Sequence, residues 1–313
     1  FTHQGIPYPV TMCTSETFQA LDTFEARSDD IVLASYPKCG SNWLLHIVKF
    51  PVLECGDPEK YQSRPLHNLF CKLTVCIFKR MKQFSSPRIL ATHLHYDKLP
   101  GSIFENNAKI LVLFRNPKDT AVSFFHFHND VPDIPSYGSW DEFFRQFMKG
   151  QVSWGSYFDF AINWNKHIDD ANVKFILYED LKENLTSGVK QIAEFLGFSL
   201  TEEQIETIST RSTFQAMRAK SQETHGAVGR FLFRKGKIAL VSGISSEVGD
   251  WKNLFRETQS QAMDEKFQEC GSGYSPFPIH RAAEAGEPKG SEAPQAPPLP
   301  GTTQQIPSWG SSQ

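Results

Sequence analysis

The segment 31–43 places the strongest constraint on the fold of this chain. A run of β-branched and apolar residues, 31–36, is followed by a tight turn, and an apolar helical pattern begins at Ser41. This order places the first N–H groups of the helix, which carry partial positive charge and have no partner within the helix, at the end of a strand. Lys38 adds a full charge, and Gly40 allows a ligand to approach the backbone closely. The segment therefore predicts a site for a multiply charged anion.

This loop differs from the Walker A loop of ATP-binding proteins. In a Walker A loop the Lys follows the second Gly and precedes Ser or Thr, whereas Lys38 precedes Gly40. The order of residues therefore disfavours a P-loop kinase or ATPase, and it favours a different phosphorylated donor.

The composition of the whole chain limits its partners. Lys and Arg number 32 and Asp and Glu number 35, a net charge of −3, so we expect no nucleic-acid partner and no membrane partner. An anionic ligand must then be held by cations placed locally. No apolar run is long enough to predict a membrane-spanning helix. The six Cys residues form no CxxC pair, which favours reduced thiols and a cytoplasmic location.

Strand-like and helical patterns alternate along the chain, which is typical of an α/β fold with a mostly parallel sheet flanked by helices. We expect strands at 31–36, 88–95, 109–114 and 173–178, and helices at 118–129, 140–149, 156–168, 186–196 and 201–208. These elements predict a single domain, residues 1–270. Residues 271–313 are rich in Pro, Gly, Ser, Ala and Gln, and we expect this tail to be disordered because it buries too little apolar area.

Three candidate binding segments follow the ends of predicted strands. In open parallel sheets, ligands bind beyond the carboxyl ends of the strands. Because 36–43, Arg115 and Tyr178 each come directly after a strand pattern, we expect them at one edge of the sheet. The guanidinium of Arg115 suits a phosphate, and an ion pair with Asp119 is the alternative.

Four motifs resemble, in the same order, those of the cytosolic sulfotransferases. Tyr36-Pro-Lys-Cys-Gly-Ser-Asn-Trp43 is similar to the 5′-phosphosulfate loop of that family, usually Tyr-Pro-Lys-Ser-Gly-Thr-Thr-Trp. The other motifs are Phe114 to Asp119 with Ser123, Tyr178 to Glu183, and Arg234 to Gly236 with Gly249 to Asn253. The resemblance covers most of residues 5–270, and within the family it is greatest to the family-6 branch.

The resemblance implies transfer of a sulfuryl group from 3′-phosphoadenosine 5′-phosphosulfate (PAPS), bound by a P-loop-like phosphosulfate loop, with no metal. Lys38 is implied as a catalytic residue that stabilises the leaving oxygen. Trp43 is implied to stack on the adenine, although taken alone it would be interpreted as core packing. The implied cosubstrate-binding residues are Lys38, Cys39, Gly40, Ser41 and Asn42 at the 5′-phosphosulfate, Arg115, Ser123, Arg234, Lys235 and Gly236 at the 3′-phosphate, and Trp43, Tyr178, Ser212, Phe214 and Met217 at the nucleoside.

The same resemblance implies that His93 is the general base. Imidazole titrates near neutrality and can accept a hydroxyl proton. The family form is Lys-Thr-His, whereas this chain has Ala91 in place of the Lys, which would have helped to neutralise the transferring sulfuryl group. A purely structural role for His93 is one alternative. Another is a metal pair of His93 and His95 on one strand face, although neither a carboxylate nor a Cys lies at ligand spacing.

The thiol of Cys39 lies in the anion loop, where the helix N-terminus and Lys38 are expected to be able to lower its pKa. The alternative is that Cys39 is a small residue in the place of Ser. Sequence alone leaves both interpretations open.

The acceptor site is expected to be apolar, because the chain contains 26 Phe residues and several lie near the predicted site. We expect a small hydrophobic hydroxylated acceptor. The candidate lining residues are Phe124, Phe125, Phe127, Phe231 and Phe233, with Tyr8 and Met12.

Three segments depart from the family pattern. Pro51 is expected to end the helix that begins at Ser41 after about two turns, because Pro disfavours helix at the residue before it. Residues 63–79 do not resemble the family, and residues 237–246 form an insertion that is expected to displace the Arg-Lys-Gly motif. These departures keep a second function open, that of a non-catalytic nucleotide- or acceptor-binding protein with the same fold.

The dimer motif of the family also differs here. It maps onto residues 252–261, where Arg256 and Glu257 replace an apolar Thr-Val pair and Gln261 replaces Glu. Burying this charged pair in an interface would be costly. A homodimer of the family type is therefore doubtful.

Overall fold

The computed structural model describes residues 1–271 except for 11, 55–83, 85, 132–133 and 220–247. The predicted departures at 63–79 and 237–246 lie outside the described residues. So do residues 272–313, the tail that we expect to be disordered.

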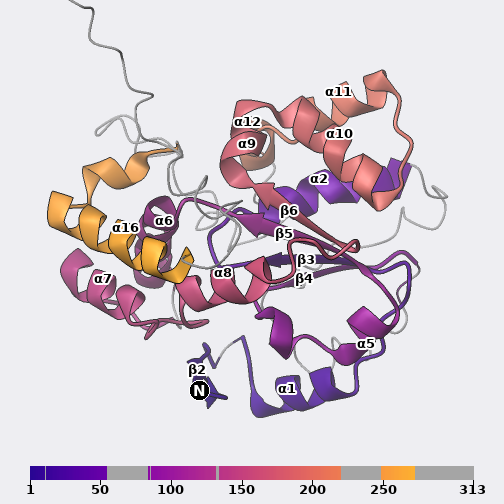
Figure 1. Ribbon diagram of the computed structural model, residues 1–313. Helices are drawn as coiled ribbons and strands as arrows, with labels where there is room; N and C mark the ends of the chain where they lie inside the picture. Colours follow the sequence, from indigo (N-terminus) through magenta and orange to yellow (C-terminus); the bar gives the residue numbers. More distant parts are fainter. Residues whose placement is uncertain (11, 55–83, 85, 132–133, 220–247, 272–313) are drawn as a thin grey trace, which may run out of the picture.

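Four parallel strands form the central sheet, in the order β4-β3-β5-β6 (Figure 1). They are β3 (Ile31–Ser35), β4 (Ile89–Thr92), β5 (Lys109–Phe114) and β6 (Val173–Leu177). Leu33 lies opposite both Ala91 and Leu111 in the register. Parallel sheets are usually covered on both faces, and all five residues of β3 are buried. The predicted α/β class is confirmed and a strand is present in each of the four predicted segments, although β4 is shorter than the predicted 88–95.

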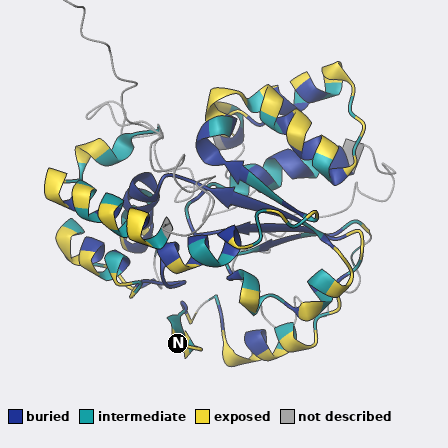
Figure 2. Ribbon diagram, viewed as in Figure 1, coloured by how far each residue is buried: buried dark blue, intermediate teal, exposed yellow. Residues whose placement is uncertain are grey.

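Helices cover the two faces of the sheet, as the buried and exposed sides in Figure 2 show. On the face drawn uppermost in Figure 1 lie α2 (Ser41–Glu54), α9 (Tyr178–Glu183), α10 (Leu185–Leu196), α11 (Glu202–Arg211) and α12 (Phe214–Ala219). The remaining elements are α1 (Ser15–Asp22), η1 (Tyr96–Lys98), α5 (Gly101–Glu105), α6 (Pro117–Asp130), α7 (Trp140–Met148), α8 (Tyr157–Asn165), η3 (Asp250–Asn253), α16 (Glu257–Gly271) and a small antiparallel pair, β1 (Thr2–His3) and β2 (Ile6–Pro7).

Strand residues alternate between two apolar clusters. Val32 and Ala34 belong to a cluster with side chains of α1, α5, α6, α7, α8 and α16. Ile31 and Leu33 belong to a second cluster with α2, α9, α10 and α11. Successive strand side chains point to opposite faces, so a single run of apolar residues builds both layers.

Helix α2 corrects one prediction. It was expected to end after about two turns, yet it runs from Ser41 to Glu54 with Pro51 inside it. Pro removes one backbone hydrogen bond, but Leu44, Ile47 and Val48 are fully buried against the sheet. Because helical stability in proteins comes mainly from packing an apolar face, this contact carries the helix past Pro51.

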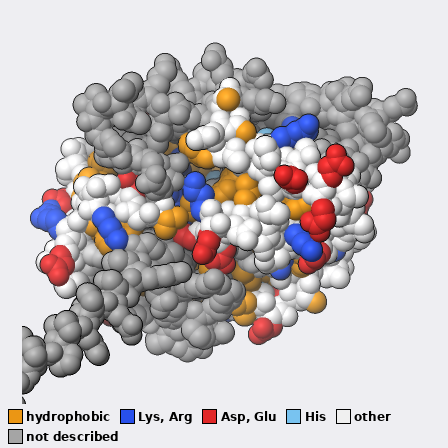
Figure 3. Space-filling view, turned by 90° about the horizontal axis from the view of Figure 1, so that it is seen from above, with side chains coloured by type: hydrophobic (Ala, Val, Ile, Leu, Met, Phe, Trp, Pro, Cys, Tyr) orange, Lys and Arg blue, Asp and Glu red, His pale blue; other side chains and the backbone are white. Residues whose placement is uncertain are grey.

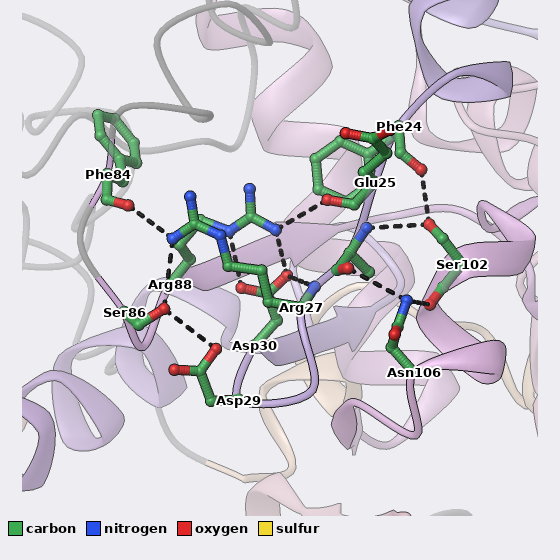
Figure 4. Close-up of polar contacts among 11 residues, drawn as sticks. Phe24, Glu25, Arg27, Asp29, Asp30, Phe84, Ser86, Arg88, Ser102 and Asn106 are labelled. Atoms are coloured by element: carbon green, nitrogen blue, oxygen red, sulfur yellow. Dashed lines mark hydrogen bonds and ion pairs between the residues drawn. The ribbon is translucent and has the colours of Figure 1, made fainter.

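A polar cluster ties together the amino ends of β3 and β4 (Figure 4). The candidate ligand segments follow the carboxyl ends of the strands, at the opposite edge of the sheet. Arg88 forms a bidentate pair with Asp30, with Nε 2.7 Å from Oδ1 and Nη2 on Oδ2, and the side chains are 2% and 0% exposed. The backbone N–H of Arg27 also donates to Asp30, at 2.8 Å. Ser102 of α5 accepts from the backbone N–H of Ala26 and donates to the carbonyl of Phe24.

Replacing Asp30 with Ala is expected to destabilise the fold, because it leaves the Arg88 guanidinium buried without its carboxylate. Loss of one partner of a buried pair costs about 3–5 kcal/mol. Urea unfolding would measure this, with Asp29→Ala as the control, since Asp29 is exposed and accepts a surface hydrogen bond from Ser86. Equal midpoints for the two variants would contradict the prediction.

Candidate active site at the carboxyl edge of the sheet

Residues that follow all four strands meet at one edge of the sheet. The loop after β3 contains Lys38, His93 follows β4, Arg115 follows β5, and Tyr178 follows β6. Arg115 joins three of these elements, because its Nη1 donates to the carbonyl of Lys38 at 3.1 Å and its guanidinium lies 4.5 Å from the centre of the Tyr178 ring. The predicted convergence at one sheet edge is therefore present.

The anion loop adopts an unusual backbone conformation. Lys38 and Gly40 have φ angles of 71° and 103°, in the left-handed region. A Cβ at Gly40 would lie 2.8 Å from Cδ2 of Tyr178, so only Gly fits both the conformation and the space. The Ser41 hydroxyl is buried and shares a hydrogen bond with the Ser35 hydroxyl. Asn42, which follows in α2, is half-buried.

The side chain of Cys39 points into the core instead of toward a ligand. It is fully buried in the same cluster as α6, and its Sγ lies 3.7 Å from Oγ1 of Thr120. Burial raises the pKa of the Cys39 thiol to about 12. Of the two interpretations of Cys39, a small residue in the place of Ser is therefore favoured over a thiol with a lowered pKa, because desolvation outweighs the nearby positive charge. Cys39 fills the place of a small residue, and it can line an anion only through its backbone.

The ammonium group of Lys38 lies 4.7 Å from the centre of the Phe127 ring on α6. The alternative for Arg115, an ion pair with Asp119, does not hold the turn that follows β5. Asp119 accepts hydrogen bonds from the backbone N–H groups of Gly249 at 2.8 Å and Trp251 at 2.9 Å. Lys38 and Arg115 are thus two cations on adjacent loops, linked through the Lys38 carbonyl.

Aromatic residues form the other end of the site. The Trp43 ring meets the Tyr178 ring edge-on at 5.2 Å, and its Nε1 donates to the carbonyl of Ser212 at 2.7 Å. Lys182 lies 5.8 Å from the Trp43 ring and 5.7 Å from the Phe214 ring. Trp43 is half-buried, so it is not simply a core residue.

Five of the predicted cosubstrate-binding residues either lie apart from Trp43, Tyr178 and Arg115 or lie outside the described residues. Ser123 is half-buried on α6, and Met217 is buried on α12. Within the part of the chain that is described, neither makes a hydrogen bond or ring contact with Trp43, Tyr178 or Arg115. The Arg234, Lys235 and Gly236 motif lies outside the described residues.

His93 lies one residue beyond the end of β4, half-buried at the same edge. Its Nδ1 is 2.6 Å from the carbonyl oxygen of Ser35. A carbonyl can only accept, so Nδ1 carries the hydrogen and Nε2 is the basic nitrogen. Burial, with a smaller contribution from Lys38, lowers the pKa of His93 to about 4. The imidazole is therefore neutral near pH 7 and can accept a proton.

The alternative of a metal pair formed by His93 and His95 is not supported by the strand geometry. The strand was expected to extend to residue 95, but β4 ends at Thr92, so His93 and His95 do not share a strand face. His95 packs edge-on against Phe160 at 5.7 Å. Among the described residues, no group of three or more His, Cys, Asp or Glu side chains is placed to hold a metal ion.

Trp154 is a neighbour of His93 that sequence reasoning missed. The two rings meet edge-on at 5.6 Å. Trp154 and Gly155 have φ angles of 66° and 78°, and the Tyr36 hydroxyl donates to the Gly155 carbonyl at 2.7 Å. A Trp-Gly pair between two helical patterns was the available signal, since Gly favours such a turn.

The predicted acceptor residues are only partly near the anion loop. Phe127 contacts Lys38, whereas Phe124 is fully buried and packs edge-on against Tyr36 at 5.7 Å. Phe125 lies against Trp140. Tyr8 is buried beside Phe18, and Met12 is half-buried; Phe231 and Phe233 lie outside the described residues.

Basic and acidic side chains are interspersed over the described part of the face seen in Figure 3. This agrees with a net charge of −3 and leaves anion binding to local cations such as Lys38 and Arg115. Among the described residues, no helix is both long enough and apolar enough to cross a membrane.

Comparisons with known proteins agree with this geometry. The sulfotransferase domain model matches residues 28–275. Sulfotransferase 6B1 of Homo sapiens is 74% identical over 290 residues, covering 88% of this chain and 87% of the relative. Sulfotransferase 6B1 of Danio rerio is 47% identical over 268 residues, covering 85% and 86%.

A crystal structure of mouse sulfotransferase SULT7A1 complexed with PAP has a TM-score of 0.76 at 30% identity, covering 91% of this chain and 99% of that one. The predicted similarity to the family-6 branch is confirmed by the relatives. The strand-end loops, the two linked cations and these matches lead to one conclusion: the chain belongs to the sulfotransferase family.

Proposed function

We propose that this protein transfers a sulfuryl group from PAPS to a hydroxyl, or an amine, of a small hydrophobic acceptor. The observation that carries the proposal is the arrangement of Lys38, Arg115 and neutral His93 at one sheet edge. The mouse relative that is complexed with PAP supports a PAPS-type nucleotide as the cosubstrate.

In this proposal, the donor lies along the line of residues from Lys38 to Trp43. Lys38 and the backbone from Cys39 to Asn42 bind the 5′-phosphosulfate, where the start of α2 favours an anion. Arg115 binds the 3′-phosphate together with Ser123 and the 234–236 motif. The adenine stacks on Trp43, beside Tyr178, Ser212, Phe214 and Met217.

His93 acts as the general base. Its Nδ1–H is held by the Ser35 carbonyl, which orients Nε2 toward an acceptor hydroxyl. The base takes the hydroxyl proton as the oxygen attacks sulfur, and the S–O bond to the leaving phosphate breaks. Lys38 stabilises the negative charge that develops on the leaving oxygen. Trp154 and Phe127 are the apolar neighbours against which the acceptor would pack.

The alternative function is binding without turnover. It is favoured by Ala91, where the family has Lys, because Ala91 is buried in the cluster beneath α2 and brings no charge to the site. Incubation with labelled PAPS and a panel of phenols and sterols separates the two functions. Transfer of label supports the enzyme, whereas nucleotide binding by calorimetry without transfer supports the alternative.

We further propose that the protein does not form the family-type homodimer and that it acts in the cytoplasm. Arg256 pairs with Asp141 of α7, and Nε2 of Gln259 donates to the same carboxylate at 2.9 Å. The dimer motif is thus engaged within the chain. Cys13, Cys39 and Cys270 are free thiols, as a reducing compartment favours.

A further inference from the structure

Glu179 is a buried carboxylate beside the donor site that the proposed mechanism does not use. It is the second residue of α9, next to Tyr178, and is 8% exposed. Its Oε1 accepts a hydrogen bond from the backbone N–H of Asn116 at 2.9 Å. In the described part of the chain, Oε2 has no hydrogen-bond partner. A carboxylate rarely occupies such a position unless it is paired.

The hydrogen bond of Glu179 falls on the turn that carries Arg115. Asn116 is fully buried and caps α6, with its side chain accepting from the N–H groups of Lys118 and Asp119. The carbonyl of Arg115 accepts from the Tyr157 hydroxyl at 2.7 Å. The peptide between Arg115 and Asn116 is therefore held from both sides, through its carbonyl by α8 and through its N–H by α9.

We propose that Glu179 is a positioning residue for donor binding, which fixes the Arg115–Asn116 peptide so that the Arg115 guanidinium is aimed at the 3′-phosphate. The inference rests on the proposed function, because it assumes that the site binds a PAPS-type nucleotide. It adds a residue that acts through Arg115 and does not touch the reacting atoms.

The charge of Glu179 gives this role a pH dependence. The groups that face it are Arg115, Asp119, Cys39, Tyr157 and Tyr178. Burial raises the pKa of Glu179 to about 7, although Arg115 and the Asn116 N–H oppose this rise. As pH rises through this range, a negative charge appears beside an anion site and should weaken nucleotide binding. Nucleotide binding in turn should draw a proton onto Glu179.

Two substitutions separate the hydrogen bond from the charge. Glu179→Ala removes the acceptor, and at pH 6, where Glu179 is mostly protonated, we expect the Kd for adenosine 3′,5′-bisphosphate (PAP) and the KM for PAPS to rise about tenfold, the effect of one well-placed hydrogen bond, with a smaller change in kcat. Glu179→Gln keeps an oxygen that can accept from Asn116, so it should restore wild-type affinity at pH 6. Because Gln carries no charge, this variant should bind PAP severalfold more tightly than wild type at pH 8.

The experiment is calorimetric titration with PAP at pH 6, 7 and 8, in buffers of different ionisation enthalpy, for wild type and both variants. Glu183→Gln is the matched control, because Glu183 is an exposed carboxylate on the same helix. The titration of the PAP phosphates is common to all four proteins, so the ratio of their Kd values isolates Glu179. Proton uptake on binding should be smaller for Glu179→Gln than for wild type and for Glu183→Gln.

Every result of these titrations either supports or overturns the positioning role of Glu179. Weak binding by Glu179→Ala with recovery in Glu179→Gln supports the inference. Equal affinity of wild type and Glu179→Ala, or loss of affinity in Glu179→Gln as large as in Glu179→Ala, overturns it while leaving the proposed function intact. If Glu179→Ala does not fold, a constant ratio of wild-type to Glu179→Gln Kd across the pH range overturns it. Absence of PAP binding by wild type overturns the proposed function, and the inference with it.

Discussion

His93→Asn is expected to reduce sulfuryl transfer by about 10²–10⁴, the usual contribution of a general base, while donor affinity stays nearly unchanged. The Asn side-chain amide can still donate to the Ser35 carbonyl as Nδ1 of His93 does, so the local fold should be kept. It offers no basic nitrogen to the acceptor. Steady-state kinetics with a phenol or sterol acceptor, together with PAP calorimetry, would measure the two effects separately.

The pH profile gives a second check on His93. Because burial lowers its pKa to about 4, the imidazole is neutral and able to accept a proton at every pH above that value. Wild-type kcat/KM should therefore lack the fall near pH ~6.5 that an exposed His would produce. The same shift means that stability contributed by neutral His93 is lost as pH falls below about 6.5 toward the folded-state pKa.

The assignment of His93 as the general base would be contradicted if His93→Asn retained turnover. It would also be contradicted if this variant lost thermal stability and PAP affinity together with activity. The second outcome would indicate that His93 only packs against Trp154. His95→Asn serves as the control, since His95 is also a buried His, packed against Phe160.

Lys38→Ala is expected to lower kcat by about 10²–10³, the effect of removing one group that stabilises charge in the transition state. Lys38 lies in the loop before α2, and its carbonyl accepts from Arg115. The backbone contact survives the substitution, so PAP binding should weaken much less than the rate. Single-turnover kinetics with saturating PAPS would separate the chemical step from binding.

The control for Lys38 is Lys98→Ala. Lys98 forms a partly exposed ion pair with Asp97 at 2.9 Å, and its loss removes the same charge from the chain. Transfer by Lys98→Ala should stay near the wild-type rate. Near-normal transfer by Lys38→Ala would show that another group stabilises the leaving oxygen.

Local patterns in the sequence were sufficient to predict the central strands and most of the longer helices of the fold. The apolar runs at 109–114 and 173–178 match β5 and β6 closely, and the 3.6-residue pattern at 186–196 matches α10. The short helices α5, α9 and α12 were missed, because five or six residues show too little periodicity to identify a helix. Helix α1 and helix α16 were also not predicted; α16 is held to α6 by the buried Lys118, which pairs with Asp264 at 2.7 Å.

The sequence by itself determined which functional residues come directly after which strand. A parallel sheet brings the carboxyl ends of its strands to one edge, so the positions of 36–43, Arg115 and Tyr178 after three strand patterns were enough to place them together. His93 joins them only because β4 ends at Thr92, inside the predicted strand 88–95. Gly40 was likewise identified from its loop. The steric requirement for Gly comes from the start of α9, because the Tyr178 ring would lie 2.8 Å from any Cβ at this position.

The tertiary structure alone decided those features that depend on burial and on contacts between distant segments. Packing on the sheet carries α2 past Pro51, and burial turns the Cys39 thiol inward and raises its pKa to about 12. Trp154 reaches His93, and Glu179 reaches the N–H of Asn116, from segments far away in the sequence. Desolvation and long-range hydrogen bonds act on the folded chain as a whole, so no local pattern could reveal them.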